Sequence, residues 1–284
     1  METSQEISKK SKSNFYYTFA FLPRRKRDAI KSVYAFCRMT DDIVDDQNES
    51  IEIKSQKLKG WKEKFQNSLV KKNENLLLAE LKEVIDLYKI PVHPFLDLID
   101  GVEMDLIKNR YENFDELKKY CYGVASTVGL MTIPIFGYKN KDTEKFAVNL
   151  GIALQLTNII RDVKFDALND RIYIPQDEII KFDYSEKELH NSVYNAKFFE
   201  LMKYQTDRAK YFYSTADKFL VSKDKHSMYT ARAMEYIYKR LLDNIVNEKY
   251  NVFGQKIIIS NFNKIFISLA VFLKYKTIYK WLSA

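Results

Sequence analysis

The sequence is poor in the residues that divide or cross-link a chain. Its 284 residues include seven glycines and five prolines, and no Ser/Gly-rich, Pro-rich or repeated segment marks a linker. We therefore predict a single domain over residues 1–284, although the length alone would also permit two. The two cysteines, Cys37 and Cys121, and the three histidines lack metal-ligand spacing. This argues against zinc and for a reducing compartment.

Targeting signals are absent as well. The N-terminus lacks the charged and apolar regions of a signal peptide, and the longest apolar run near the C-terminus, Ile265 to Leu273, is about half of a membrane span. We expect a cytoplasmic protein, with peripheral association at the inner membrane face as an open alternative.

The net charge of +8, with a pI near 9.1, admits a nucleic-acid partner in principle. No nucleic-acid-binding motif is present, however, so we expect no such partner. The one basic run, Arg24 to Arg27, follows Pro23 at a predicted helix start. A solvated helix entry explains this run most simply, and attraction to an anionic membrane is the alternative.

Helical periodicity dominates and no alternation typical of strands appears, which predicts an all-α protein. The predicted helices cover residues 5–21, 24–47, 51–71, 75–89, 94–110, 114–137, 142–167, 176–182, 186–219, 225–250 and 255–282. Asn113 with Glu116 and Ser185 with Glu188 resemble helix-capping pairs, and Pro175 suits a helix start.

Two acidic clusters interrupt apolar helical stretches, one at Asp41 to Asp46 and one at Asn158 to Asp166. In each cluster the polar residues share one helix face, because they recur three or four positions apart. The faces hold Tyr34, Arg38, Asp41 and Asp45, and Gln155, Asn158, Asp162 and Asp166. An apolar stripe of Ile152, Leu156, Ile159 and Val163 runs beside the second. The carboxylates therefore belong at the rim of a core-facing surface, with a loop over residues 167–174 above the second cluster.

Facing rows of aspartates oppose folding unless a cation lies between them. Two like charges about 4 Å apart repel by roughly 4 kcal/mol at an effective dielectric constant near 20. Oxygen donors suit Mg²⁺, which takes one or two carboxylates and completes its shell with water and phosphate oxygens. With Arg38, Arg161 and Arg171 nearby, we predict a site for Mg²⁺ and a diphosphate. A purely solvated acidic face fits the mixed Asn, Gln and Asp register less well.

The helix predicted from Asp115 to Gly137 mixes small and bulky residues. A glycine inside a helix costs about 1 kcal/mol, so another interaction must offset Gly123 and Gly129. Close helix packing is one explanation. The other is the wall of an apolar tunnel, with Tyr120, Val124 and Val128 on one stripe.

Four motifs together resemble the squalene and phytoene synthase family in order and spacing, over about residues 11–250. They are Arg38-Met39-Thr40-Asp41-Asp42-Ile43-Val44-Asp45-Asp46, Tyr120-Cys121-Tyr122-Gly123-Val124-Ala125, Leu154-Gln155-Leu156-Thr157-Asn158-Ile159-Ile160-Arg161-Asp162-Val163 and Arg171-Ile172-Tyr173-Ile174-Pro175. The resemblance implies an all-α isoprenoid-synthase bundle with a central hydrophobic tunnel. It also implies Mg²⁺ between two aspartate-rich helices and head-to-head joining of two allylic prenyl diphosphates.

The resemblance also implies residue roles. Metal ligands would be Asp41, Asp45, Asn158, Asp162 and Asp166. Diphosphate would contact Arg38, Arg161, Arg171 and Tyr173. The tunnel would be lined by Phe15, Phe19, Tyr120, Val124, Val128 and Gln155, and Tyr34 and Tyr238 would lie near the reacting carbons. Glu103 and Asp105 match an acidic position of less certain purpose. Before Asp166 the family usually has Gly-Glu, whereas this chain has Val163-Lys164-Phe165. Lys164 is taken to replace a carboxylate, which puts the outer part of the second metal site in doubt.

Three phrases, at residues 122–130, 135–138 and 148–163, look most like bacterial presqualene diphosphate and squalene synthases. They favour two farnesyl diphosphates as substrates, giving presqualene diphosphate and then squalene or another C30 product. The alternatives are 15-cis-phytoene synthase, which uses two geranylgeranyl diphosphates, and dehydrosqualene synthase. Mg²⁺ is the expected ion with Mn²⁺ as a substitute, and NADPH is needed only for squalene.

Three rival functions stay open. A head-to-tail elongase should carry a second DDxxD, and a terpene cyclase typically has Ser or Thr and Glu at the later ligand positions. A non-catalytic helical assembly factor would have lost the aspartates. The oligomeric state and the choice between C15 and C20 substrates are not predicted.

Overall fold

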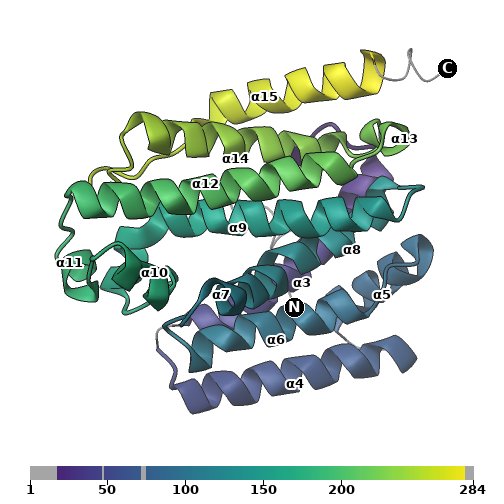
Figure 1. Ribbon diagram of the computed structural model, residues 1–284. Coiled ribbons are helices and arrows are strands. Elements are labelled where there is room, and N and C mark those ends of the chain that lie inside the picture. Colours follow the sequence, from purple (N-terminus) through teal and green to yellow (C-terminus); the bar gives the residue numbers. More distant parts are fainter. Residues whose placement is uncertain (1–17, 47, 72–74, 279–284) are drawn as a thin grey trace.

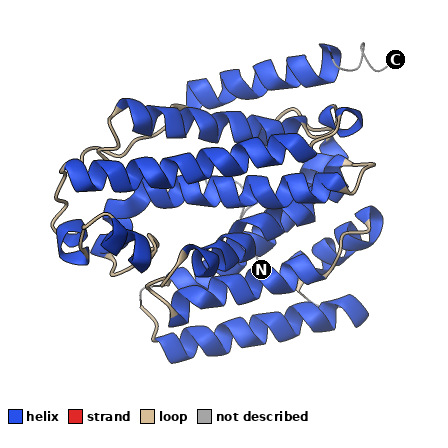
Figure 2. Cartoon of the chain, in the orientation of Figure 1, coloured by secondary structure: helices blue, strands red, loops and turns tan. Residues whose placement is uncertain are grey.

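The computed structural model describes residues 18–46, 48–71 and 75–278. Every regular element in these ranges is a helix (Figure 2). The one strand-like pairing within these ranges is an isolated parallel bridge between Arg110 and Ile172. The all-α prediction is therefore confirmed. Among these described residues no helix combines the length and apolar composition needed to cross a bilayer.

The helix bounds follow the predicted pattern closely in the first two thirds of the chain. The elements are α3 (Arg24–Asp45), α4 (Ile51–Val70), α5 (Leu76–Tyr88), α6 (His93–Ile107), α7 (Phe114–Cys121), a π-helical turn η1 (Tyr122–Ser126), α8 (Thr127–Phe136), α9 (Asp142–Leu168), α10 (Gln176–Lys181), α11 (Glu186–His190), α12 (Ala196–Phe219), α13 (Ser222–Lys225), α14 (Tyr229–Asn247), α15 (Asn261–Leu273) and η2 (Lys274–Ile278).

The two acid-bearing helices, α3 and α9, belong to different groups of helices. Helix α3 packs against α4, α5, α6 and α8, whereas α9 packs against α12, α14 and the α8–η1 segment. In Figure 1, α9, α12, α14 and α15 form successive layers above the α4–α6 group. The α8–η1 segment contacts both groups, so it joins the halves of the molecule that carry the acidic clusters.

Side-chain caps begin several helices where the sequence predicts them. The Asn113 side chain accepts a hydrogen bond from Glu116 N at 3.1 Å, and Ser185 Oγ accepts one from Glu188 N at 3.2 Å. Pro175 directly precedes α10, whose first turn is acidic as the helix dipole favours.

The later helices are shorter than predicted. The predicted helix 186–219 breaks at residues 191–195, because Asn195 caps a new helix by accepting from Phe198 N at 2.9 Å. The predicted helix 225–250 begins only at Tyr229, and it ends before Lys249 and Tyr250, which have positive φ. Helix α15 starts at Asn261, after the Ser260 cap. The predicted helix 5–21 lies mostly outside the described residues.

The basic run at the start of α3 is partly folded onto the body. Lys26 Nζ donates to the carbonyl of Phe136 at the end of α8, at 2.7 Å. Burial and the nearby Lys276 lower the pKa of Lys26. This contact fits the helix-entry interpretation of the run.

The glycines of η1 and its neighbours bring backbones into contact. A Cβ atom added to Gly101 would lie 2.6 Å from Cα of Gly123, and one added to Gly151 would lie 2.5 Å from Cα of Ser126. Only glycine fits at such distances. Close helix packing thus explains the small residues of this segment. Other residues of the same segment, Val124 and Val128, line a cavity.

Candidate active site

A polar pocket and an apolar cavity meet beside α3. Each has a volume of about 250 Å³. Asp41, Val124 and Gln155 line both, so the polar pocket adjoins the apolar cavity. The polar pocket is completed by Val44, Asp45, Val102, Asp105, Tyr120, Arg171 and Tyr173. Acids, an arginine and two phenols thus lie at one end of a largely apolar space.

Asp105 organises the floor of the polar pocket. Its carboxylate accepts hydrogen bonds from the hydroxyls of Tyr120 at 3.0 Å and Tyr173 at 2.8 Å. The two phenol rings stack with centroids 5.1 Å apart, and Tyr111 packs against both. Burial raises the pKa of Asp105. The sequence did not assign a role to Asp105, and the structure shows that it holds the hydroxyls of two tyrosines.

The carboxyl groups of the acidic clusters are held in an unfavourable environment. Burial and the neighbouring Asp45 carboxylate raise the pKa of Asp41 from 3.8 to about 7. Burial and Asp162 raise the pKa of Asp166 from 3.8 to about 7. Negative charge is thus concentrated without enough compensation from the protein, an arrangement that favours binding of a cation.

Asn158 supplies an unused oxygen at the same place. Its Oδ1 atom is buried and has no hydrogen-bond partner, while its Nδ2 donates to Gln155 Oε1 at 3.3 Å. Leaving a buried acceptor unpaired costs about 1–3 kcal/mol, so a ligand for this atom is favoured. Within the described ranges no three His, Cys, Asp or Glu side chains converge on one point. Mg²⁺ takes few protein ligands and completes its shell with other oxygens, and Asn158 Oδ1 is an oxygen of the type that it prefers.

The predicted phosphate-binding arginines surround these acids. Arg38 pairs with Asp42 at 2.5 Å, and Arg161 Nε donates to the adjacent Asp162 at 2.9 Å. Arg171 lies in the polar pocket, and it also lines a small neighbouring space with Asp166. Each arginine therefore stands within the acidic surroundings where the sequence predicted it.

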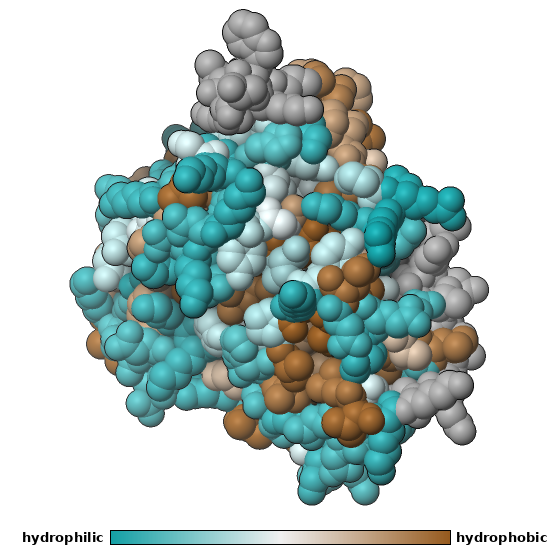
Figure 3. Space-filling model, turned by 90° about the vertical axis from the view of Figure 1, so that its right-hand side faces the viewer, coloured by the Kyte–Doolittle hydropathy of each residue, from teal (hydrophilic) through white to brown (hydrophobic). Residues whose placement is uncertain are grey.

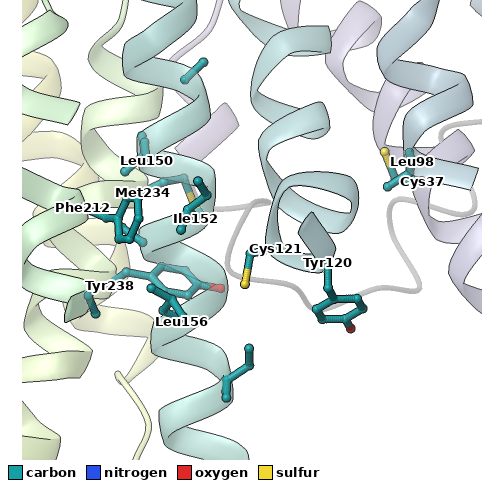
Figure 4. Close-up of a cluster of buried hydrophobic side chains, with 14 of the residues drawn as sticks. Cys37, Leu98, Tyr120, Cys121, Leu150, Ile152, Leu156, Phe212, Met234 and Tyr238 are labelled. Atoms are coloured by element: carbon teal, nitrogen blue, oxygen red, sulfur yellow. The ribbon is translucent and has the colours of Figure 1, made fainter. Parts of the chain in front are cut away.

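Most of the predicted tunnel residues line the apolar cavity. Its lining includes Phe19, Tyr34, Arg38, Val124, Val128, Gln155, Asn158 and Tyr238. Figure 4 shows Leu150, Met234 and Tyr238 together on one side and Cys37 and Leu98 on the other. Tyr120 lies in the polar pocket instead, because its hydroxyl is bound by Asp105. Phe15 lies outside the described residues.

The connection between α14 and α15 lies beside the second cluster, a feature that the sequence did not indicate. Lys164 Nζ donates to the carbonyl of Phe253 at 2.7 Å. Lys256 approaches Asp162 Oδ1 to 3.5 Å. The Lys164 that departs from the family pattern therefore anchors this connection, and no local periodicity could reveal a contact 89 positions away.

Comparisons with known proteins identify the family of this chain. The squalene/phytoene synthase family model matches residues 8–263. The chain is 33% identical over 276 residues to the 15-cis-phytoene synthase of Synechococcus elongatus, covering 93% of this chain and 89% of that protein. It is 36% identical over 266 residues to phytoene synthase 1, chloroplastic, of Arabidopsis thaliana, covering 92% of this chain but only 63% of the plant protein.

Solved structures show the same fold. A dehydrosqualene synthase matches with a TM-score of 0.83 at 27% identity, covering 94% of this chain and 93% of the other. A squalene synthase from Alicyclobacillus acidocaldarius matches with a TM-score of 0.79 at 22% identity, covering 87% and 93% respectively. The predicted isoprenoid-synthase fold is confirmed by these matches. With more than half of its length matched by the family model, the chain belongs to the squalene/phytoene synthase family.

Proposed function

We propose that this protein is a Mg²⁺-dependent prenyltransferase that joins two allylic prenyl diphosphates head to head, using two C20 geranylgeranyl diphosphates to form phytoene. One observation carries the proposal: Asp41 and Gln155 line both the polar pocket and the apolar cavity. A molecule with an anionic head and an apolar tail matches such a pair of adjoining spaces.

The proposed metal ligands are Asp41, Asp45, Asn158, Asp162 and Asp166. Their oxygens are the donors that Mg²⁺ prefers, and the orphaned Oδ1 of Asn158 supports the fit. When bound, Mg²⁺ would neutralise the negative charge that grows on a departing diphosphate, and Mn²⁺ would serve as a substitute. Burial and neighbouring carboxylates raise the pKa values of Asp41 and Asp166, and a bound cation would relieve this unfavourable environment.

Arg38, Arg161, Arg171 and Tyr173 are the proposed diphosphate contacts. Guanidinium groups bind phosphate oxygens in pairs, and Arg38 and Arg161 are already held by aspartates at this end of the cavity. An incoming diphosphate would compete with those aspartates for the arginines, and a metal would take up the freed carboxylate of Asp162.

The walls of the apolar cavity would protect the reaction. Val128, Leu150 and Met234 keep the space apolar, so an allylic cation formed there meets little water. The faces of Tyr34 and Tyr238 can add about 0.5–2 kcal/mol of cation-π stabilisation. The chain itself therefore binds the head group, excludes water and surrounds the reacting carbons.

The choice of C20 rests on the names of the relatives. The similar curated proteins from Synechococcus elongatus and Arabidopsis thaliana are phytoene synthases. They favour the phytoene alternative over the farnesyl preference drawn from three short phrases of the sequence. The likeness to a dehydrosqualene synthase at 27% identity supports two C15 units as the second candidate.

A competition assay tests the substrate choice. The protein is incubated with equal amounts of C15 and C20 diphosphates and Mg²⁺, with and without NADPH, and the products are separated by mass. We expect a C40 hydrocarbon to dominate in both conditions. A dominant C30 product would favour the second candidate, and a longer linear diphosphate or a cyclic C15 product would reject head-to-head joining altogether.

A further inference from the structure

Helix α15 carries large apolar side chains on its outer side as well as on its inner side. Phe262, Phe266, Leu269 and Leu273 recur three or four positions apart and therefore share one face. All four are exposed, Phe262 by 76% and Phe266 by 61%. The inward face presents Ser268 and Val271, which are buried.

An ordinary surface helix turns an apolar stripe toward the core and a polar face to solvent. Helix α15 packs Ile267 and Phe272 inward but is apolar on its outer side too. We call Phe262, Ile265, Phe266, Leu269 and Leu273 the outer face of α15. The exposed Ile258 just before the helix extends it. Helix α15 packs on α14 and is the outermost helix at the top of Figure 1. Figure 3 shows apolar side chains gathered at the top of the molecule. A continuous exposed patch of this kind marks an interaction site.

The charge around the outer face is predominantly positive. Between residues 249 and 278 the sequence contains no Asp or Glu. It contains five lysines there, Lys249, Lys256, Lys264, Lys274 and Lys276. A groove of about 490 Å³ runs between α14 and α15, and its lining includes Lys239, Arg240 and Lys274 together with one acid, Asp243. Lys256 pairs with Asp162 instead, so the cations that border the apolar stripe are those of the groove.

We propose that the outer face of α15 docks on an anionic phospholipid membrane, with α15 lying in the plane of the interface. An exposed apolar stripe with lysines at its margins is the pattern of interfacial helices. A second copy of the chain fits this face less well, because a twofold interface would bring two mostly basic faces together, with Asp243 alone among the groove residues to oppose them. The inference stands apart from the proposed reaction, since it depends on neither substrate nor metal.

Vesicle sedimentation of the full-length protein tests the proposal. The test variant is Phe262→Glu/Phe266→Glu. The matched control is Ile51→Glu/Ile53→Glu on α4, at the opposite side of the molecule in Figure 1, where both side chains are also exposed. Both variants change the net charge equally, so only the position of the change differs.

We expect the wild type and the control to bind vesicles of phosphatidylcholine mixed with phosphatidylglycerol and to release them in high salt. The α15 variant should partition at least about tenfold less, because two apolar anchors are lost and two repelling charges gained. Equal binding by the two variants would overturn the proposal, as would equal binding to vesicles of phosphatidylcholine alone. Light scattering would also reject it if the wild type proved to be a dimer that only the α15 variant dissociates and that does not bind vesicles.

Discussion

At the scale of single residues, the site is an accumulation of negative charge that the protein leaves incompletely neutralised. Asp41 and Asp166 have pKa values near 7 because of burial and of the carboxylates beside them. The oxygen of Asn158 nearby is buried and unpaired. These features cost stability in the metal-free protein, which is typical of a site shaped for a ligand rather than for folding.

This charge predicts how the stability of the metal-free protein depends on pH. The folded protein binds more protons than the unfolded chain between pH 3.8 and about 7, because the pKa of Asp41 is raised over that window. In EDTA, the contribution of Asp41 should therefore lower the free energy of unfolding by about 2 kcal/mol or more as the pH rises through this window.

Denaturant unfolding of wild type and Asp41→Asn at pH values across the window isolates this contribution. As the pH rises, the free energy of unfolding of the variant should increase relative to that of the wild type. Mg²⁺ should reduce this difference, because it would bind the ionised carboxylate of the wild type. Parallel pH profiles for the two proteins in EDTA would show that Asp41 carries no such strain.

Helical spacing alone predicted which polar residues share a face. The stripes through Asp41 and Asn158 were visible because residues three or four apart share a face. The Asp105–Tyr120–Tyr173 arrangement was not, because its members come from α6, α7 and a loop that meet only after folding. The family resemblance named all three residues, but it did not predict the hydrogen bonds between them.

At the scale of elements, backbone contact at glycines fixes the distance between helices. A Cβ atom on Gly101 would lie 2.6 Å from Gly123 Cα, and backbone at that distance cannot yield as a flexible side chain can. Gly101→Ala should thus lower the free energy of unfolding by about 1–3 kcal/mol.

Gly60→Ala is the matched control in another helix. An added Cβ atom meets nothing within 4 Å there, so the substitution should stabilise the protein by about 0.5–1 kcal/mol through helix propensity. Urea unfolding measures both variants. Equal effects of the two substitutions would contradict the close contact between α6 and η1.

A second prediction concerns the connection between α14 and α15. Lys164→Met removes the hydrogen bond to the Phe253 carbonyl and should cost about 1 kcal/mol. Limited trypsin digestion should then cut sooner after Lys256, since the connection is released from α9. Lys203→Met, at an exposed position of α12, serves as the control. If digestion rates match in the two variants, Lys164 does not anchor the connection.

Element boundaries were predictable where local signals set them and not where tertiary contacts did. The caps at Asn113 and Ser185 follow from sequence because the bonded partners lie three residues away. The separation of α13 from α14 does not. There, Asp224 is held by the backbone of Lys139 and Asn140 and by the Thr143 hydroxyl, from a distant turn.

At the scale of the whole molecule, the function depends on how two groups of helices meet. Helices α3 and α9 carry the acids in separate groups, and the α8–η1 segment packs against both. Its tight glycine contacts bring the polar pocket and the apolar cavity together along Val124. Periodicity could predict helices and acidic faces, but it could not predict that the polar pocket adjoins the apolar cavity. The sequence suggested this only through the family resemblance, and the structure shows it.

The central claim is that the acidic clusters and the adjoining cavity together join two prenyl chains. The most direct measurement incubates wild type and Asp41→Asn with labelled geranylgeranyl diphosphate and Mg²⁺, and quantifies the C40 hydrocarbon. Circular dichroism and the matched variant Asp42→Asn, altered at the exposed neighbour, control for folding. We predict C40 product from wild type and from Asp42→Asn, and a loss of at least about 100-fold in Asp41→Asn with its helical spectrum intact. Undiminished product from Asp41→Asn, or no product of doubled chain length from the wild type with either prenyl diphosphate, would contradict the account.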